Sequence, residues 1–161
     1  MSHISVRPEF SDTLAIKSGR HPIRTFLSPP LIPNDVYASL ESSLVLITGP
    51  NQSGKSTYLS QICLLTLLSH VGCFVPAEYA SVRITTRLCT LLGSDDLLGA
   101  NASTFMNEMR AMASILGSID EHTLVVLDEL GRGTSVSDGL AITLAICEAL
   151  LKTHVRSYAL Y

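Results

Sequence analysis

The stretch LVLITGPNQSGKST, residues 44–57, decides the fold of this 161-residue chain. Its first four residues are apolar without a break, which is typical of a buried parallel strand. Gly49 to Ser56 then match the pattern G-x-x-x-x-G-K-[ST], in which glycines let backbone N–H groups curve around an anion. A helix expected from Lys55 to about His70 points its positive end at the same anion. The stretch therefore predicts a phosphate-binding loop between a strand and a helix.

Each residue type in this loop has a chemical reason to be there. The Lys55 ammonium would reach the β- and γ-phosphates of a nucleotide, and the Ser56 hydroxyl would ligate Mg²⁺. ATP with Mg²⁺ is the expected ligand. A glycine-containing turn with an exposed lysine is the plain structural alternative. The predicted nucleotide-binding residues of the loop are Gly49, Pro50, Asn51, Gln52, Ser53, Gly54, Lys55, Ser56 and Thr57.

A second apolar run, residues 124–127, ends in two carboxylates, Asp128 and Glu129. Asp128 is predicted to hold Mg²⁺ directly or through water. Glu129 is placed to polarise a water for attack on the γ-phosphorus, as a general base must be. Strand ends are commonly acidic, so the pair alone is weak support. Together with the loop it predicts a hydrolytic nucleotide site in which Glu129 and Lys55 are catalytic.

Strands and helices are expected to alternate along the remaining chain. Further strands are expected at 87–92 and 123–127, with one or two more within 71–84 and loop over 93–101. Helices are expected at 138–151 and from Ser103, as N-cap, to about Gly117, where a core-facing stripe consists of Phe105, Met109, Met112 and Leu116. This alternation predicts an α/β fold with a mostly parallel sheet flanked by helices.

Proline content suggests where the domain begins. Residues 1–35 carry five of the seven prolines, each of which removes an amide donor and favours extended geometry before it. We therefore expect an irregular lead-in over 1–35 and one domain over 36–161. No segment approaches the roughly 20 consecutive apolar residues that span a bilayer, and the N-terminus lacks a secretory signal. Membrane contact is not expected.

Charge and cysteine content exclude other classes. The formal net charge is −3, so no uniformly basic surface exists to neutralise a run of phosphates. If DNA is bound, it is contacted elsewhere. The four cysteines form no CxxC pair, and none of the five histidines stands at metal-ligand spacing from them. A disulfide framework and a zinc site are both disfavoured, and the thiols are expected to be small buried hydrophobes in a reducing compartment.

Further motifs resemble those of one family. The segments are STFMNEM (103–109), DELGRGTS (128–135) followed by Asp138-Gly139, FVPAE (74–78) and GRHP (19–22). In this order they resemble the ATPase domain of the MutS family of mismatch-repair and recombination proteins, from about Lys17 to the end of the chain. Within that family IPND (32–35), Ser53 and AEYAS (77–81) look most like the meiotic branch, that of MutS homologue 4.

The resemblance implies an ABC-like P-loop ATPase fold in which two subunits pair and each site takes residues from both. Asn51, Lys55, Ser56, Asp128 and Glu129 would act in cis, whereas Ser103 would face the nucleotide of the partner subunit. Residues 131–135 would cross the dimer interface. The implied partners are a paralogous MutS-family subunit, giving a heterodimer, and double-stranded or branched DNA held by regions outside this chain. Mismatch repair or meiotic recombination in the nucleus is the implied role.

The sequence departs from the family at several points. Gln52 stands where the family usually has Met, and Leu91-Leu92-Gly93 replaces a segment that usually carries an arginine. The family's last strand is followed by a Thr-His pair whose histidine senses the γ-phosphate, and this chain ends at Tyr161 before such a pair. Thr153-His154 precedes that strand and is assigned no catalytic role. We therefore expect a truncated chain with poor hydrolysis on its own.

Two other functions remain open at this point. One is a partner subunit that holds nucleotide and hydrolyses little or none. The other is a small-molecule P-loop kinase, which would want an arginine-rich lid. Only Arg110 and Arg132 occur between Gly93 and Lys152, so the kinase is the weaker of the two.

Overall fold

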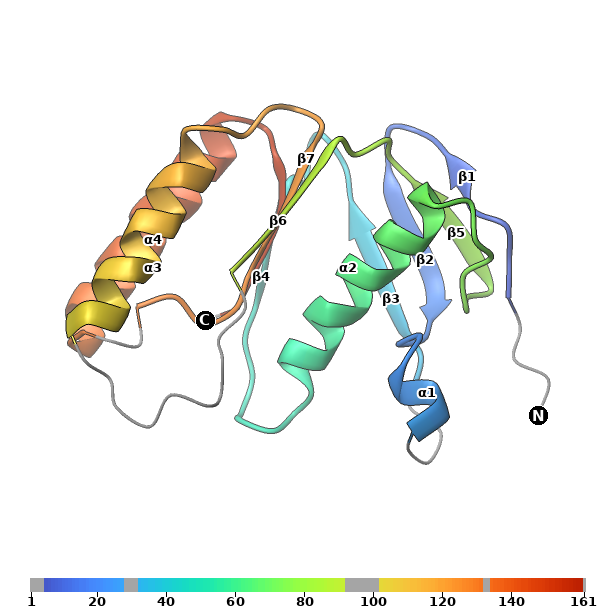
Figure 1. Cartoon of the computed structure of the whole chain (residues 1–161), viewed down its shortest axis with the longest axis horizontal. Helices are drawn as coiled ribbons and strands as arrows, with labels where there is room; N and C mark the ends of the chain where they lie inside the picture. The colour runs from blue at the N-terminus through green and yellow to red at the C-terminus, as the bar shows by residue number, and fades with distance from the viewer. Residues whose placement is uncertain (1–4, 28–31, 92–101, 132–133, 161) are drawn as a thin grey trace. The chain divides into compact units, whose positions relative to one another are not determined.

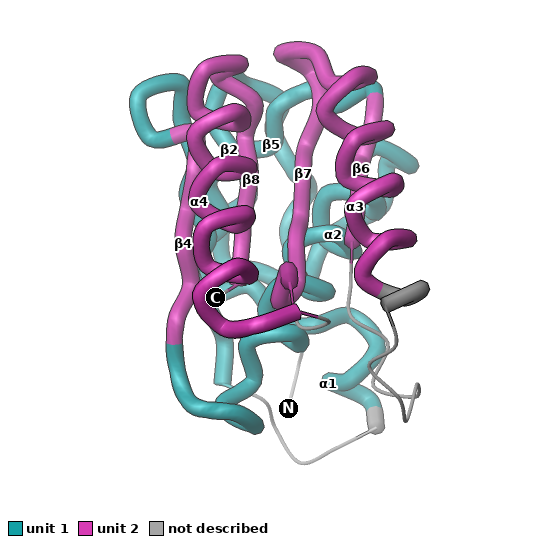
Figure 2. Tube along the Cα trace, turned by 90° about the vertical axis from the view of Figure 1, so that its left-hand side faces the viewer, with its two compact units in different colours: residues 1–42, 49–86 teal, residues 43–48, 87–161 magenta. Residues whose placement is uncertain are grey.

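The structure is a computed structural model of the chain, and it describes residues 5–27, 32–91, 102–131 and 134–160. The chain forms two compact units (Figure 2). Unit 1 consists of residues 1–42 and 49–86, and unit 2 consists of residues 43–48 and 87–161. The loop expected over residues 93–101 lies outside the described residues. The boundary between residues 35 and 36 stays a prediction.

Unit 2 is built on a four-stranded sheet in the order β4-β8-β7-β6. Its strands are β4 (Leu44–Ile47), β6 (Arg87–Leu91), β7 (Thr123–Leu127) and β8 (Arg156–Leu160), and every neighbouring pair is parallel. The expected α/β fold with parallel strands is thereby confirmed. The two central strands, β7 and β8, are buried along their whole length. The apolar run of β7 suits such a position.

Strand β4 is parallel, as expected, but it is not buried. It stands at one edge of the unit 2 sheet, beside β8 alone, and the Leu46 side chain is 51% exposed. An apolar run predicts a strand without showing whether that strand will be central or at an edge. The strand expected at this position is therefore present and parallel, but the expectation that it would be buried was wrong.

Two helices lie side by side on one face of this sheet, α3 (Ala102–Leu116) and α4 (Val136–Lys152) (Figures 1 and 2). They enclose a core with β7 and β8, whose buried members include Met112, Val125, Leu127, Leu130, Ile146, Leu150 and Ala159. Phe105, Met109 and Leu116 are only half-buried beside Met112. The expected core stripe is therefore confirmed in full at Met112 alone.

Unit 1 has a mixed sheet in the order β1-β5-β2-β3. Strands β2 (Leu14–Gly19), β3 (Asn34–Ala38) and β5 (Tyr79–Val82) are antiparallel neighbours, and the short β1 (Glu9–Phe10) adds in parallel to β5. The segment expected to be irregular thus contains a six-residue strand. Leu14 and Ile16 are buried between more exposed neighbours, the period of two that marks a half-buried strand. The nearby prolines, Pro8 and Pro22, fall outside β2.

Helix α2 (Lys55–His70) packs on β2, and the short helix α1 (Arg24–Leu27) follows that strand in the chain. A Cβ atom at Gly19 would lie 3.0 Å from Gln61 Nε2 and 3.1 Å from Leu65 Cδ1. A larger residue would force these side chains to shift, so glycine lets α2 lie close against the strand. The helix that begins at Lys55 is thereby packed on β2 within unit 1.

The four cysteines are reduced, and their burial differs. Cys63 and Cys147 are buried and Cys89 is half-buried, whereas Cys73 is exposed. The expectation of buried thiols was thus wrong for Cys73, because it lies beyond the end of α2 in the turn that follows. Burial raises the pKa of Cys63 to about 11 and also raises the pKa of Cys89 and Cys147. The buried thiols are therefore protonated at neutral pH and serve packing.

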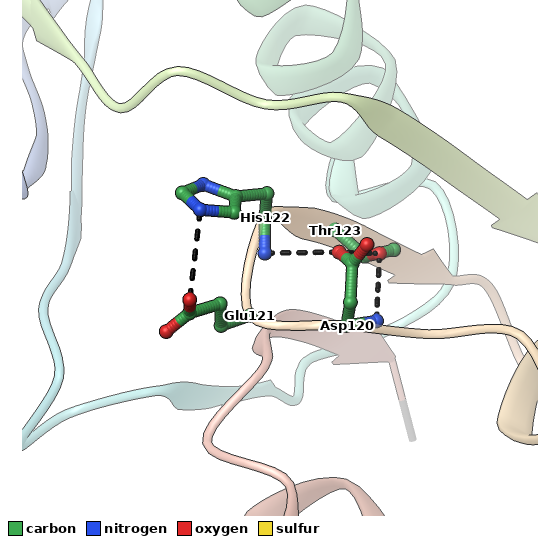
Figure 3. A network of polar contacts seen from close by, with 4 residues as sticks. All are labelled: Asp120, Glu121, His122 and Thr123. Atoms are coloured by element: carbon green, nitrogen blue, oxygen red, sulfur yellow. Dashed lines mark hydrogen bonds and ion pairs between the residues drawn. The ribbon is translucent and has the colours of Figure 1, made fainter.

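A hydrogen-bonded turn leads into β7 (Figure 3). Asp120 Oδ1 accepts a bond from the Thr123 hydroxyl at 2.9 Å and one from the His122 backbone N–H at 3.0 Å. These bonds, first that from Thr123, hold the pKa of the Asp120 carboxyl below its ordinary value, with a smaller contribution from the Arg87 guanidinium. Arg87 itself donates to the Ser118 carbonyl. The turn thus fixes the start of the strand whose far end carries the two predicted carboxylates.

Candidate nucleotide site

The loop between β4 and α2 has the backbone that an anion cradle needs. Gly54, the N-cap of α2, has φ +97° and ψ 12°, a left-handed conformation that L side chains rarely adopt. Gln52 is also left-handed, with φ +65°. No side chain caps the start of α2, and its first turn carries no acidic residue. The first backbone N–H groups of the helix therefore keep their positive partial charge for an anionic ligand.

Lys55 is folded back over this loop. Its Nζ donates to the Gly49 carbonyl at 2.7 Å and to the Pro50 carbonyl at 3.1 Å. Two carbonyl oxygens of the loop thus hold the ammonium group of Lys55 over the turn. Phosphate oxygens, which carry full charge, are stronger acceptors than neutral carbonyls. The lysine is therefore arranged to exchange its intramolecular bonds for bonds to a phosphate.

The other predicted loop residues face outward. Asn51, Gln52, Ser53 and Ser56 are exposed, and Thr57 is half-buried at the first turn of α2. The backbone N–H of Ser53 donates to the Pro50 carbonyl at 3.3 Å, which closes the turn. The loop therefore presents its polar groups to solvent, where a nucleotide could reach them.

A pair of hydrogen bonds that the sequence did not predict fixes the first two turns of α2. The Tyr58 hydroxyl donates to the Asp35 carbonyl at 2.8 Å, and Asn34 Nδ2 donates to Gln61 Oε1 at 3.3 Å. Burial, with the nearby Asp35 carboxylate, raises the pKa of Tyr58. The contacts join residues far apart in the chain, so no local pattern could have revealed them. They hold the helix that starts at Lys55 against β3.

The two predicted carboxylates follow β7 directly. The Asp128 backbone N–H donates to the Leu91 carbonyl at 2.8 Å, which extends the β6–β7 pairing by one residue. The Asp128 side chain is 7% exposed, and its Oδ1 has no hydrogen-bond partner among the described residues. Glu129 is half-buried and has φ +51°, a left-handed conformation that is uncommon for a glutamate.

The buried oxygen of Asp128 fits a divalent cation. An unpaired polar atom in the interior costs free energy, and Mg²⁺ prefers hard oxygen ligands such as carboxylates and hydroxyls. Ser56 offers such a hydroxyl in unit 1, and Asp128 offers such a carboxylate in unit 2. The donor types are therefore those that Mg²⁺ requires.

The remaining predicted features concern the start of α3, two loops and the residues before β8. Helix α3 begins at Ala102, so Ser103 lies in its first turn and not at the N-cap as expected. A serine is favourable at either position, so the local pattern did not distinguish the two. Arg132 and Gly133 of the expected interface loop, and Leu92 and Gly93 of the arginine-free segment, lie outside the described residues. Thr153 and His154 precede β8, away from the carboxyl ends of β7 and β8.

Neither a membrane-spanning helix nor a cluster of metal ligands occurs among the described residues. None of the helices is both long enough and apolar enough to cross a membrane. No group of three or more His, Cys, Asp and Glu side chains in this part of the chain could hold a metal ion.

A parallel strand, a glycine-containing loop and a helix that begins at Lys55, with a second strand followed directly by Asp128-Glu129, define an α/β protein of the P-loop type. The comparisons with known proteins give the family. The model of MutS domain V matches residues 45–161. The chain therefore belongs to the MutS family, in its domain V.

Relatives agree with this assignment. The chain is 46% identical over 157 residues to the MutS protein homolog 4 of Mus musculus and 44% identical over 157 residues to the DNA mismatch repair protein MSH4 of Arabidopsis thaliana. It is 48% identical over 156 residues to the DNA mismatch repair protein MutS of Thermus aquaticus. These matches cover 96–97% of this chain and 16–20% of the relatives. The chain thus spans about a fifth or less of their length.

Proposed function

We propose that this chain is the ATP-binding and ATP-hydrolysing domain of a MutS-type DNA clamp. The observation that carries the proposal is Lys55, whose ammonium lies on the Gly49 and Pro50 carbonyls at the start of an uncapped helix. A lysine in this place, above a left-handed glycine, is arranged to bind the phosphates of a nucleotide. The membership in the MutS family supports ATP as that nucleotide.

In this proposal each predicted residue has one task. The backbone N–H groups of residues 51–54 cradle the phosphates, and Lys55 offsets the charge of the β- and γ-phosphates. Ser56 and Asp128 hold Mg²⁺, which neutralises phosphate charge when it is bound. Glu129 orients a water and takes its proton. Nucleotide binding and catalysis thus use different side chains, so they can be separated by mutation.

The partners are also proposed. We infer a heterodimer with a paralogous MutS-family subunit, in which Ser103 at the start of α3 contacts the nucleotide of that subunit. Double-stranded or branched DNA is held by parts of the protein outside this chain, since the chain carries a net charge of −3. One of the relatives above is named MutS protein homolog 4 and another MSH4. We therefore favour the meiotic branch, with recombination intermediates as the substrate and the nucleus as the location, over mismatch repair.

The loop is tested by Lys55→Ala in calorimetric titrations with ATP and Mg²⁺. Loss of a charged donor to phosphate removes about 1.5–3 kcal/mol, so the dissociation constant should rise roughly 10- to 150-fold. Lys152→Ala, at the last turn of α4, is the matched control and should bind as the wild type does. Equal affinities for Lys55→Ala and the wild type would refute the site.

The release of phosphate, measured with and without DNA, tests the catalytic part separately. Turnover that responds to DNA and to a partner subunit supports an ATPase. Tight nucleotide binding without turnover under any of these conditions supports instead a nucleotide-binding subunit with little or no hydrolysis.

A further inference from the structure

The three residues that follow Asp128 have an unusual backbone. Glu129 has φ +51° and Gly131 has φ +78°, so two left-handed residues flank one ordinary residue, Leu130. The Leu130 side chain is 6% exposed and belongs to the core of unit 2 with Leu127 and Ile146. A left-handed glutamate is strained because its Cβ crowds its own backbone. Such a conformation persists only when its surroundings impose it.

The contact that can impose it is a crossing of two glycine backbones, at Gly131 and Gly139. A Cβ atom at Gly131 would lie 2.8 Å from the Gly139 Cα, and a Cβ atom at Gly139 would lie 2.9 Å from the Gly131 carbonyl oxygen. Both obstacles are backbone atoms, so no side chain can rotate to make room. The segment after β7 and the first turns of α4 thus touch at a distance that only glycine permits.

Gly139 is itself held in place by α4. Its backbone N–H donates to the Ser135 carbonyl at 2.8 Å, and its carbonyl accepts a bond from the buried Thr143 hydroxyl at 2.8 Å. Glycine weakens a helix relative to alanine. Glycine at residue 139 therefore does not stabilise the helix, and the close contact with Gly131 explains why a glycine is present there.

We propose that the Gly131–Gly139 crossing holds Glu129 in its left-handed conformation and so directs its carboxylate for catalysis. Gly131 and Gly139 are then positioning residues. The segment is fixed at its start by the Asp128 N–H bond to Leu91, in its middle by the buried Leu130, and at its end by the crossing. This inference rests on the proposed function, in which Glu129 activates the attacking water.

A double-mutant cycle on the full chain tests the coupling without requiring activity. Glu129→Gly removes the strain of the left-handed glutamate, and Gly139→Ala removes the crossing. If the crossing maintains the strain, Glu129→Gly should stabilise Gly139→Ala less than it stabilises the wild type. The expected coupling is about tenfold in the folding equilibrium constant, measured by urea unfolding, since left-handed strain is of that order. Additive effects of the two substitutions would overturn the proposal.

Controls distinguish the crossing from general effects of glycine. Gly117→Ala, just after α3, meets only ordinary contacts and should show no coupling to Glu129→Gly. The sign of the Glu129 φ angle, from NMR scalar couplings, should be positive in the wild type and in Gly117→Ala and negative in Gly139→Ala. A simple loss of stability would not reverse this sign. If Gly139→Ala fails to fold, Glu129→Gly is compared with Glu129→Ala, because both variants lack the glutamate side chain and a glycine variant no more stable than the alanine variant would show that residue 129 is not strained.

Activity gives an independent readout. Gly139→Ala should bind ATP with the affinity of the wild type, by calorimetry, and in the dimer with a MutS-family partner subunit its rate of phosphate release should fall about 10-fold or more, because only the general base is displaced. A wild-type chain that binds no ATP would refute the proposed function and leave the double-mutant cycle standing. Normal phosphate release by a folded Gly139→Ala protein would refute the positioning role.

Discussion

Raising the pH from 8 to 10 should weaken the folded chain through the buried thiol of Cys63. Burial raises the pKa of this thiol from 9.0 to about 11. Between these two values the unfolded chain has lost the proton and the folded chain has kept it, so the free energy of unfolding falls as the pH rises. At pH 10, one unit above the pKa of the unfolded thiol, the free energy of unfolding should be about 1.4 kcal/mol lower than at neutral pH. Below pH 8 the effect should vanish.

The assay is urea unfolding of the wild type and Cys63→Ala at several pH values between 7 and 10. The buried thiols of Cys89 and Cys147 are present in both proteins, so their contributions cancel in the difference. Cys63→Ala should lose about 1.4 kcal/mol less than the wild type over this range. Cys73→Ala, at an exposed cysteine, is the matched control and should keep the wild-type pH dependence. Equal pH dependences for the wild type and Cys63→Ala would show that the Cys63 thiol is not buried as the structure describes.

Four further outcomes are expected. In a full-length dimer, Glu129→Gln should retain ATP in calorimetry while phosphate release falls by about 10² or more, because shape is kept and the base is lost; hydrolysis at the wild-type rate would assign the water to another group. Gly19→Ala should lower the free energy of unfolding by about 1–3 kcal/mol through overpacking against α2, and an unchanged urea midpoint would contradict the close contact. The pKa of Asp120 is lower in the folded chain than its ordinary value. The charged carboxylate therefore stabilises the fold above the ordinary carboxyl pKa, and this stabilisation is lost as the pH falls through the pKa of the folded chain. Asp120→Asn should therefore flatten the acid limb of a thermal-unfolding profile, whereas an identical limb would refute the turn in Figure 3. Ser103→Ala should reduce hydrolysis by mixed dimers more than nucleotide binding by the chain itself, and equal losses in both would argue against a role across the interface.

The sequence alone determined the elements that depend on local pattern. The loop at residues 49–56 requires glycine, lysine and serine at fixed spacing, so its type follows from those residues by themselves. Strand β7 and the predicted helix after Lys55 have the bounds that their apolar runs indicate. The carboxylates at residues 128 and 129 follow from the end of such a run. These features depend on residues that are neighbours in the chain, and tertiary contacts did not alter them.

Only the tertiary structure decided the properties that depend on which segments meet. The Leu46 side chain is exposed because β4 became an edge strand, and β2 formed in a proline-rich stretch because β3 and β5 pair with it. The left-handed Glu129 follows β7, whereas the two glycines that cross nearby, Gly131 and Gly139, come from the segment after β7 and from α4. A hydrophobic pattern reports the period of a segment and not its neighbours. The sequence therefore indicated the candidate residues by their local pattern, and only the fold showed which segments lie against them.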